Sequence, residues 1–502
     1  MSLHIESTED ALAELKKQRV KTLTAAISVS FLGVALMGLL LYLVHIIVAI
    51  PEDPPMVAYA TQEGDNPDID TPEVTQTTQR PSSSSTAAQV KVIAAVATAD
   101  VAVVNPDIEV DVPSEELSMG IDIGDGFGTG TGDGDGGGIP GIISKRCDLN
   151  DRMKRITENG GTPQCEEAVV KSLKWLQKQQ NKDGSWGGTP QNYKCAMTGL
   201  ALLSYLAHCE TPLSEDFGET VLKGISFLVD QGVKNPVISL VPQRNEVSYD
   251  HAVATYALCE AYTFCKQMDI PSIANLEKVV IKAVDRIIDA QCPNGGWAYS
   301  YNNKINPDID LSVTGWNVQA LKAAEHGGIK PTKGDIRSTL RKASSYVRKN
   351  VMPDGKFAYK ENGNMPRSSL VGVGVLSLQM TGNGSDSAAR KGLDWIKNNV
   401  KTLQWGQGSG TENVKSNLYM HYYCVQAAMN RGGDVWTSYN KAFRDAVLSG
   451  QNADGSFRKN DVGYVSGMTG KSENIYRQCL ATLMLEVYYR FLPGTGEGAR
   501  NF

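Results

Sequence analysis

One motif limits the fold of this 502-residue chain more than any other feature, because it recurs through the C-terminal part at a regular spacing. The motif is Q-x3-G-x-W/F, with well-formed copies at 180–186, 291–297 and 451–457. Degenerate copies complete a set of six glycines, at positions 184, 232, 295, 355, 406 and 455. A period of about 50 to 60 residues indicates one supersecondary unit per repeat, stacked against its neighbours.

Each motif separates two helices of different character. The segment before the first turn, 166–180, is amphipathic. Its apolar face carries Val169, Leu173 and Leu176, and its polar face carries Glu166, Lys171, Lys174 and Lys178. Such a helix lies with one side in water. The segments after the turns are apolar nearly all round, which is typical of buried helices; they are 195–207, 251–262, 368–380 and 477–489.

The residues of the turns and of the buried segments explain how such units pack. Asp-Gly at a turn suits a helix stop with a left-handed residue, and the following Trp or Phe supplies a large apolar contact. Glycines within the buried segments permit close helix approach at some cost in helix propensity; they are Gly199, Gly315, Gly372 and Gly374.

Six outer and six inner helices predict an all-α fold, a single α6/α6 toroid over residues 142–492 with a flexible tail at 493–502. The alternative is an open helical solenoid. An open array needs polar capping repeats at its ends, and none is evident, so we expect a closed ring.

The N-terminal region predicts a membrane anchor. Residues 22–50 contain no Asp, Glu, Lys or Arg, and about 20 apolar residues suffice to cross a bilayer. Basic residues precede this segment within 1–21, and PEDPP follows it. Positive charge stays cytoplasmic, so we expect a cytoplasmic N-terminus and an extracytoplasmic toroid, as in a Gram-negative inner membrane. A cleaved signal peptide is the alternative, although its apolar run is usually shorter.

Residues 51–141 predict a disordered stalk, because their Pro/Ser/Thr-rich and Gly-rich sequence cannot bury enough apolar surface to fold. A flexible coil of this length spans roughly 50 Å. Two more specific interpretations of its glycine run, a phosphate loop and a calcium site, have less support than a solvated linker. A phosphate loop at Gly124, Gly126 and Gly128 lacks the flanking strand and helix, and a calcium site rests on one isolated run with Asp122, Asp125, Asp133 and Asp135.

The Q-x3-G-x-W/F turns resemble the QW repeats of squalene and hopene cyclases, over residues 163 to about 492. The resemblance implies membership of the terpene cyclase and protein prenyltransferase toroid superfamily. Class II cyclases use a D-x-D-D-T motif whose acid is an Asp kept protonated by crowding and burial. The nearest segment here is Asp308-Ile309-Asp310-Leu311-Ser312. Asp310 is therefore the candidate catalytic acid, in a motif that lacks one carboxylate.

The resemblance to prenyltransferase β-subunits, which also have one toroid, implies a zinc site held by Asp, Cys and His. Asp310 and His421 are the two candidate ligands, but Ser312 stands where the cysteine is expected. Zinc needs a complete ligand set, so we expect no cofactor, and zinc at this pair is the alternative that stays open. A third toroid family carries the thioester motif C-G-E-Q, which Cys165-Glu166-Glu167 does not match.

Polar and aromatic residues near the starts of the inner helices form the candidate ligand-binding site. A concave site with a few converging polar groups is the default ligand-site hypothesis; the alternative for each residue is a helix cap or a buried hydrogen-bonding group. The candidates are Asp250, His251, Asp308, Thr314, Trp316, His421, Tyr422, Tyr423 and Arg477. Asp250 and Asp310 are also the one carboxylate pair we propose for glycoside hydrolysis. His208 and His326 are predicted to be surface residues.

Nine cysteines occur without a CxxC pair. Cys147 and Cys165 flank the entry to the first repeat, and outside the cytoplasm a disulfide between them is one prediction. The others fall mostly on apolar helix faces, where a free cysteine behaves as a small hydrophobe.

Two functions of different class remain open. The first is a membrane-anchored binding or scaffolding module for an apolar molecule, a peptide or a glycan, with an envelope protein as a further candidate partner. The second is an enzyme of the superfamily with a degenerate acid motif. The incomplete motif favours binding. A net charge of −6 without a basic stripe gives no reason to expect nucleic acid.

Overall fold

In the computed structural model, the described residues are 146–189, 192–301, 309–360, 364–406, 415–459, 468 and 470–490. The predicted anchor, the stalk, the C-terminal tail and Asp308 lie outside them. Within these ranges, no helix is both long enough and apolar enough to span a bilayer.

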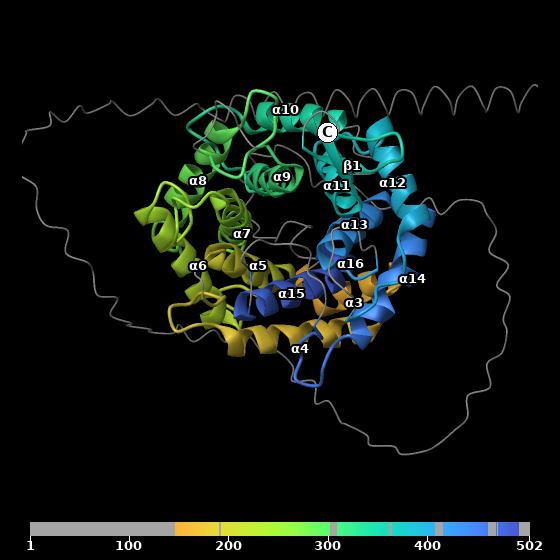
Figure 1. Cartoon of the computed structure of the whole chain (residues 1–502). Coiled ribbons are helices and arrows are strands. Elements are labelled where there is room, and N and C mark those ends of the chain that lie inside the picture. Colours follow the sequence, from red (N-terminus) through yellow and green to blue (C-terminus); the bar gives the residue numbers. More distant parts are fainter. Residues whose placement is uncertain are drawn as a thin grey trace, which may run out of the picture. The chain divides into compact units, whose positions relative to one another are not determined.

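The described residues form a double ring of helices, drawn in Figure 1. The outer helices are α4 (Pro163–Gln179), α6 (Gly218–Lys234), α8 (Leu276–Ala290), α10 (Ile336–Lys349), α12 (Ser387–Asn399) and α14 (Gly433–Ser449). The inner helices are α5 (Lys194–Ala207), α7 (Val247–Gln267), α9 (Leu311–His326), α11 (Val371–Met380), α13 (Leu418–Arg431) and α15 (Gly470–Leu485). The chain alternates between the two rings, so each inner helix begins at the end of the ring where an outer helix finishes.

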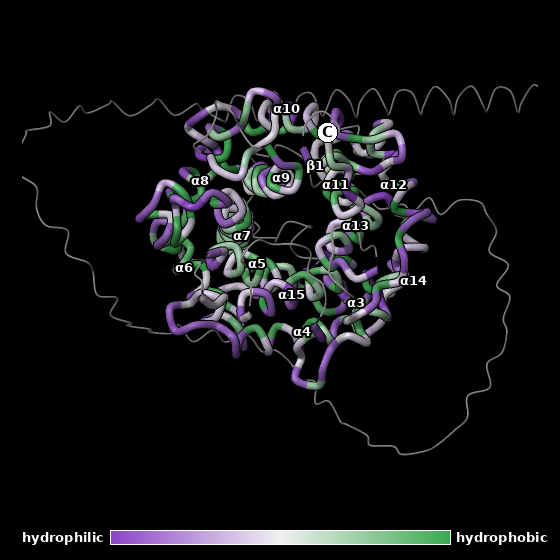
Figure 2. Tube along the Cα trace, viewed as in Figure 1, coloured by the Kyte–Doolittle hydropathy of each residue, from purple (hydrophilic) through white to green (hydrophobic). Residues whose placement is uncertain are grey.

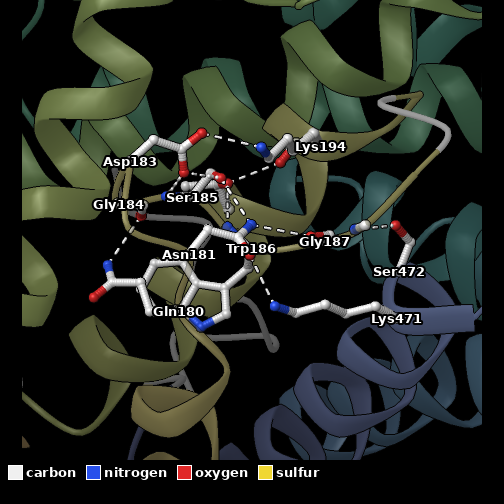
Figure 3. A network of polar contacts seen from close by, with 12 residues as sticks. Gln180, Asn181, Asp183, Gly184, Ser185, Trp186, Gly187, Lys194, Lys471 and Ser472 are labelled. Atoms are coloured by element: carbon white, nitrogen blue, oxygen red, sulfur yellow. Dashed lines mark hydrogen bonds and ion pairs between the residues drawn. The ribbon is translucent and has the colours of Figure 1, made fainter.

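The ring is closed. Each inner helix packs against the next one, and α15 packs back against α5. Figure 3 shows the first turn held by the start of α15. The Lys471 ammonium donates to Asn181 Oδ1 at 2.8 Å, and the Ser472 hydroxyl accepts from the Gly188 amide at 3.0 Å. The predicted toroid is therefore confirmed for the described residues, and the open solenoid is not.

The glutamine of each well-formed motif joins its own turn to the next outer helix. The Gln291 side-chain amide donates to the carbonyl oxygens of Gly295 and Thr339, both at 2.9 Å. Gln180 makes the equivalent bonds at its turn. Gln451 donates to Ala168 in α4, so the last motif joins the first outer helix. Each such bond satisfies a partly buried carbonyl of a turn or an outer helix, which would be costly to leave unpaired.

The aromatic residue of the motif fills the space between the outer helix and the inner helix of its own unit. Trp186 and Trp297 are fully buried. Their indole N–H groups donate to Leu176 and Ile287, ten residues earlier in the preceding outer helix, at 2.7 and 2.8 Å. A large apolar body with one satisfied donor suits such a position.

The turn glycine needs both a left-handed backbone and the absence of a side chain. Gly295 has φ of +100°, and a Cβ there would collide with the Lys342 carbonyl of α10. Gly184, Gly355 and Gly455 repeat this arrangement. Gly232 does not, because it lies inside α6 with ordinary helical backbone; the degenerate copy at that position is not a turn.

Glycines in the inner helices permit close packing, as predicted. A Cβ at Gly372 would lie 2.5 Å from the Cys424 amide nitrogen of α13, and one at Gly199 would lie 2.9 Å from the Val253 carbonyl of α7. Figure 2 shows the apolar residues concentrated on the inner helices and the polar ones on the outer surface.

A short hairpin departs from the all-α prediction. Strands β1 (Phe357–Lys360) and β2 (Asn364–Arg367) pair antiparallel, with Phe357 opposite Arg367. The 3-10 helix η1 (Ser368–Leu370) follows and leads into α11. The hairpin lies directly after the turn at Gly355. Its residue Tyr359, in β1, contacts Tyr299.

At the end of the ring opposite the motif turns, the first and last described segments pack against each other. Helices α3 (Leu149–Glu158) and α16 (Val487–Arg490) pack together there. The Arg146 guanidinium donates to the Arg490 carbonyl at 2.9 Å and pairs with Glu260 of α7 at 3.5 Å. We call this set of contacts the clasp.

The clasp corrects three sequence-based expectations. Cys147 forms its disulfide with Cys209, and Cys165 is free and buried. His208 is buried rather than on the surface, and Glu166 is buried rather than on the wet face of α4. The reason is shared: α3 folds back over the start of α4 and the end of α5, where the sequence pattern of α4 alone predicts solvent.

Candidate functional site

The most distinctive group of side chains lies where the inner helices begin. It contains four half-buried tyrosines around one carboxylate, which we call the tyrosine cluster. Its members are Tyr249 of α7, Tyr299 of the loop before α9, Tyr359 of β1 and Tyr419 of α13, with Asp310 and Ser312 at the start of α9.

Asp310 is the N-cap of α9 and is fully buried. Its Oδ1 accepts from the amides of Ser312 and Val313, at 2.6 and 3.1 Å, and from the Ser312 hydroxyl. Its Oδ2 accepts from the Tyr299 hydroxyl at 2.5 Å. Four donors on one carboxyl group favour the carboxylate over the carboxylic acid. This position therefore suits a structural cap better than a protonated catalytic acid.

The tyrosines are connected through their hydroxyl groups. The Tyr299 hydroxyl contacts that of Tyr359, and the Tyr249 hydroxyl lies 2.6 Å from Ser312 Oγ. Burial, together with the nearby Asp310 carboxylate, raises the pKa of the Tyr249 hydroxyl well above its usual range. Burial likewise raises the pKa of Tyr419. These hydroxyls therefore stay protonated at neutral pH and act as hydrogen-bonding groups rather than as bases.

A second tier of side chains continues from the cluster along α9 and α13. The Trp316 and Tyr422 rings stack with centroids 5.8 Å apart, and the Tyr423 hydroxyl donates to Gln319 Oε1 at 3.0 Å. Helix α11 lies between α9 and α13 in the ring order, so these contacts reach across it on the inner side. Tyr419, Tyr423 and Gln426 are spaced i, i+4, i+7, which places them on one face of α13.

Within this second tier, several buried polar atoms have no hydrogen-bond partner. They are Gln319 Nε2, the Tyr422 hydroxyl and Gln426 Oε1, and the Tyr419 hydroxyl joins them at the cluster. The side chains of Gln319, Gln426 and Arg490 face the Tyr422 hydroxyl. These polar groups of α9 and α13 therefore face one another and Arg490 among buried side chains.

Asp250 and His251 are engaged in structural contacts. The Asp250 carboxylate accepts from the Ala196 amide of α5 at 2.9 Å and from the Ser239 hydroxyl at 2.8 Å. His251 Nδ1 accepts from the Ile238 amide at 2.9 Å. Its Nε2 lies 3.1 Å from the Ala283 carbonyl of outer helix α8, and burial lowers its pKa to about 3. His251 is therefore a neutral residue that faces the outer ring.

The other predicted residues that the structure describes have four different placements. Thr314 bonds to the Asp310 carbonyl and the Trp297 amide, which makes it part of the turn. His421 directs Nδ1 to the Tyr439 hydroxyl of outer helix α14, at 2.8 Å. Arg477 contacts Asn474 and Glu473 on its own helix. Trp316, Tyr422 and Tyr423 do lie together, in the second tier.

His251 and His421 were predicted to line a common cavity. Both face the outer helices instead, so the structure does not support that prediction for them. Asp310 and His421 do not converge on a metal. In the described ranges, no group of three or more His, Cys, Asp or Glu side chains is placed to hold a metal ion.

Sequence reasoning missed the four cluster tyrosines, although a signal was present. Tyr299 and Tyr359 each stand two residues after the motif aromatic, in Trp297-Ala-Tyr299 and Phe357-Ala-Tyr359. Repeat-equivalent positions of one residue type indicate a shared location. Tyr419 begins the helical stripe on α13.

No family model matches the chain, and no curated protein matches it. Similar solved structures include an inactive variant of an α-1,6-mannanase from Salegentibacter sp. HEL1_6, at 10% identity and a TM-score of 0.47. That likeness covers 64% of this chain and 99% of the mannanase chain. A type II terpene cyclase from Scytonema is also similar, at 12% identity and a TM-score of 0.42, over 68% of this chain and 100% of the cyclase chain. At these values we draw no activity from either likeness.

Proposed function

We propose that this chain is a ligand-binding module carried on a membrane anchor. Residues 22–50 would hold it in the membrane, the stalk at 51–141 would give it reach, and the toroid would present the tyrosine cluster outside the cytoplasm. The sequence leaves three classes of ligand possible: an apolar molecule, a peptide and a glycan. An envelope protein that carries one of these groups would be the partner.

One observation carries the proposal. The Asp310 carboxylate at the centre of the cluster already accepts hydrogen bonds from within the chain, while the tyrosines around it are half-buried. Asp310 accepts four hydrogen bonds from its own helix and from Tyr299. Tyrosine supplies a large, rigid contact area at low entropic cost, and it is enriched at binding surfaces. The arrangement therefore supports recognition better than proton transfer.

The alternative is an enzyme of the terpene cyclase and prenyltransferase superfamily. That alternative needs Asp310 as a proton donor, and the four hydrogen-bond donors on its carboxyl group favour the ionised form, although the group is fully buried. Glycoside hydrolysis needs two carboxyl groups flanking a substrate, and Asp250 is engaged with Ala196 and Ser239.

The test compares the native chain with Asp310→Asn. An Asn side chain keeps the cap, so we expect native mass spectrometry of the membrane-extracted proteins to find the same co-purifying molecule on both. Turnover of geranylgeranyl dihydroxybenzoate and of α-1,6-mannotetraose should stay at background for both. Product formed by the native chain and lost in a folded Asp310→Asn variant would establish the enzyme instead.

A further inference from the structure

We propose that the Cys147–Cys209 disulfide is a site of thiol–disulfide exchange, which an uncharged dithiol opens in the folded protein. The inference goes beyond the proposed function and does not depend on what the tyrosine cluster binds. It concerns the clasp, where this bond joins the residue before the N-cap of α3 to the end of α5. Exchange there loosens α3 while the ring of helices stays closed.

The two bonded cysteines are the ones that a reductant can reach. Cys147 and Cys209 are both partly exposed, and both line a surface pocket of about 330 Å³. The other residues that line it are Arg152, His208, Glu210, Ser214, Glu215, Asp216 and Phe217. The seven free cysteines of the described residues are all buried. Because exchange needs a thiolate to approach a sulfur directly, access singles out this bond.

The two sulfurs differ in how easily they carry negative charge. Cys147 directly precedes Asp148, the N-cap of α3. The first amides of a helix have no partner within it, and a thiolate beside them is stabilised. Cys209 follows the C-terminal end of α5, and its amide donates to the Leu206 carbonyl at 3.0 Å. The carbonyl groups of a helix C-terminus disfavour a thiolate, so Cys147 is the better leaving group.

The exchange therefore begins at Cys209. One thiolate of the dithiol attacks Cys209 Sγ, the bond between the cysteines breaks, and its electron pair leaves on Cys147 Sγ, which takes up a proton. The second thiol of the reductant, as its thiolate, then attacks the reductant's own sulfur in the mixed disulfide. Cys209 leaves with the electron pair and takes up a proton. In total the dithiol loses two electrons and two protons, and the cysteines gain them.

A dithiol is needed because Cys147 stays close after the first step. The Arg152 guanidinium of α3 pairs with Glu166 at 3.0 Å. Arg146 also donates to the Arg490 carbonyl at 2.9 Å, so α3 keeps two fastenings without the disulfide. A tethered thiol acts at high effective concentration, and Cys147 would therefore expel a monothiol and restore the bond. The second thiol of a dithiol is tethered too and competes with that return.

The charge of the pocket favours an uncharged reductant. The side chains of Arg152 and His208 are already bonded to carboxylates within the chain. Glu215 and Asp216, which also line the pocket, are exposed. Like charge slows the approach of an anion, so a thiol that carries carboxylates meets a barrier that an uncharged thiol does not.

The first experiment measures how fast dithiothreitol reduces the bond in the full chain in detergent, by quenching with N-ethylmaleimide and peptide mass spectrometry. We expect a rate that is proportional to the dithiothreitol concentration and unchanged by urea below the unfolding transition. A bond that opens only after unfolding would be reduced at a plateau rate or faster in urea, and either result would overturn the proposal.

The site of attack is read from the intermediate. Brief exposure to 2-mercaptoethanol, followed by N-ethylmaleimide, should leave the mercaptoethanol on Cys209 and the maleimide on Cys147. The reverse pattern would contradict the assignment of Cys147 as the leaving group.

Glu215→Gln/Asp216→Asn tests the charge of the pocket. This variant should form the mixed disulfide with glutathione, an anionic thiol, about tenfold faster at low ionic strength, with the dithiothreitol rate unchanged. Asp230→Asn/Asp394→Asn is the matched control, because both residues are exposed carboxylates that do not line the pocket. Equal acceleration in the two double variants would overturn the preference for an uncharged reductant.

Hydrogen exchange shows what the bond controls. Reduction should remove amide protection from α3 and leave it in α7 and α9, which pack against each other in the inner ring. Cys147→Ser/Cys209→Ser should show the same pattern without a reductant. Unchanged protection of α3 in both would mean that the bond does not control the clasp, and that part of the proposal would fail.

Discussion

At the scale of single residues, this protein places similar side chains in opposite electrostatic settings. Burial lowers the pKa of His251 to about 3, and the hydrogen bond between its Nε2 and the Ala283 carbonyl offsets only part of that effect. His208 is also buried, and burial alone would lower its pKa. Hydrogen bonds to Glu166 and Glu210, at 3.0 and 2.9 Å, overcome that effect and raise it. The difference lies in the partner: a carboxylate stabilises the imidazolium, and a carbonyl or an amide does so far less.

His208 makes the stability of the toroid depend on pH. Its pKa in the folded state is raised above the unfolded value of 6.5, so its contribution is fully present below 6.5 and is lost as pH rises through the folded pKa. Urea unfolding of residues 142–502, followed from about pH 6 to about pH 9, should show stability falling across this range. His208→Gln should flatten the fall. Parallel curves for the two proteins would remove His208 as the cause.

At the scale of the elements, the turn after α4, α8 and α14 is the structural unit that the well-formed repeats share. The glutamine, the glycine and the aromatic residue each serve one contact: a bond to the next outer helix, a close approach to its carbonyl, and a buried bond to the preceding helix. Because Gln451 makes the same bond to α4, the local rule that joins successive units also closes the ring.

Gly295→Ala tests the close approach. A left-handed non-glycine residue costs about 1–2 kcal/mol, and the collision with the Lys342 carbonyl adds to this cost. Gly382→Ala is the matched control, since its φ is +76° but nothing lies within 4 Å of a Cβ there. We expect the Gly295 variant to lose clearly more unfolding free energy than the Gly382 variant in urea titrations. Equal losses would mean that backbone strain alone is measured.

At the scale of the molecule, the two ends of the ring differ in construction. One end carries the tyrosine cluster around Asp310. The other carries the clasp, in which Arg146 holds the Arg490 carbonyl and Cys147 is bonded to Cys209. The clasp lies where the described residues begin, at Arg146.

The disulfide should contribute measurably to stability. It closes a segment with a sequence separation of 62 residues, for which chain entropy gives about 4 kcal/mol. We expect dithiothreitol to lower the Tm of residues 142–502. The double variant Cys147→Ser/Cys209→Ser should melt at the lower temperature with or without dithiothreitol. The free cysteines of the described residues are all buried, so a reductant effect that persists in the double variant would contradict this assignment.

The sequence by itself determined the number of helix pairs, their alternation and the turns at Gly184, Gly295, Gly355 and Gly455, but the turn expected at Gly232 lies inside α6. These features follow from local chemistry: helical periodicity, the left-handed freedom of glycine and the size of an aromatic ring. It also indicated a closed ring, through the absence of a capping repeat.

Only the tertiary structure decided which polar residues meet. An inner helix is buried all round, so its sequence does not say which face points to the ring interior. His251 and His421 therefore looked equivalent to Tyr422 and Tyr423, yet the histidines face the outer helices. The partner of Cys147 was undecided for the same reason, since it depends on how α3 folds back over the ring. Contacts between segments far apart in sequence are fixed by packing, and no local pattern encodes them.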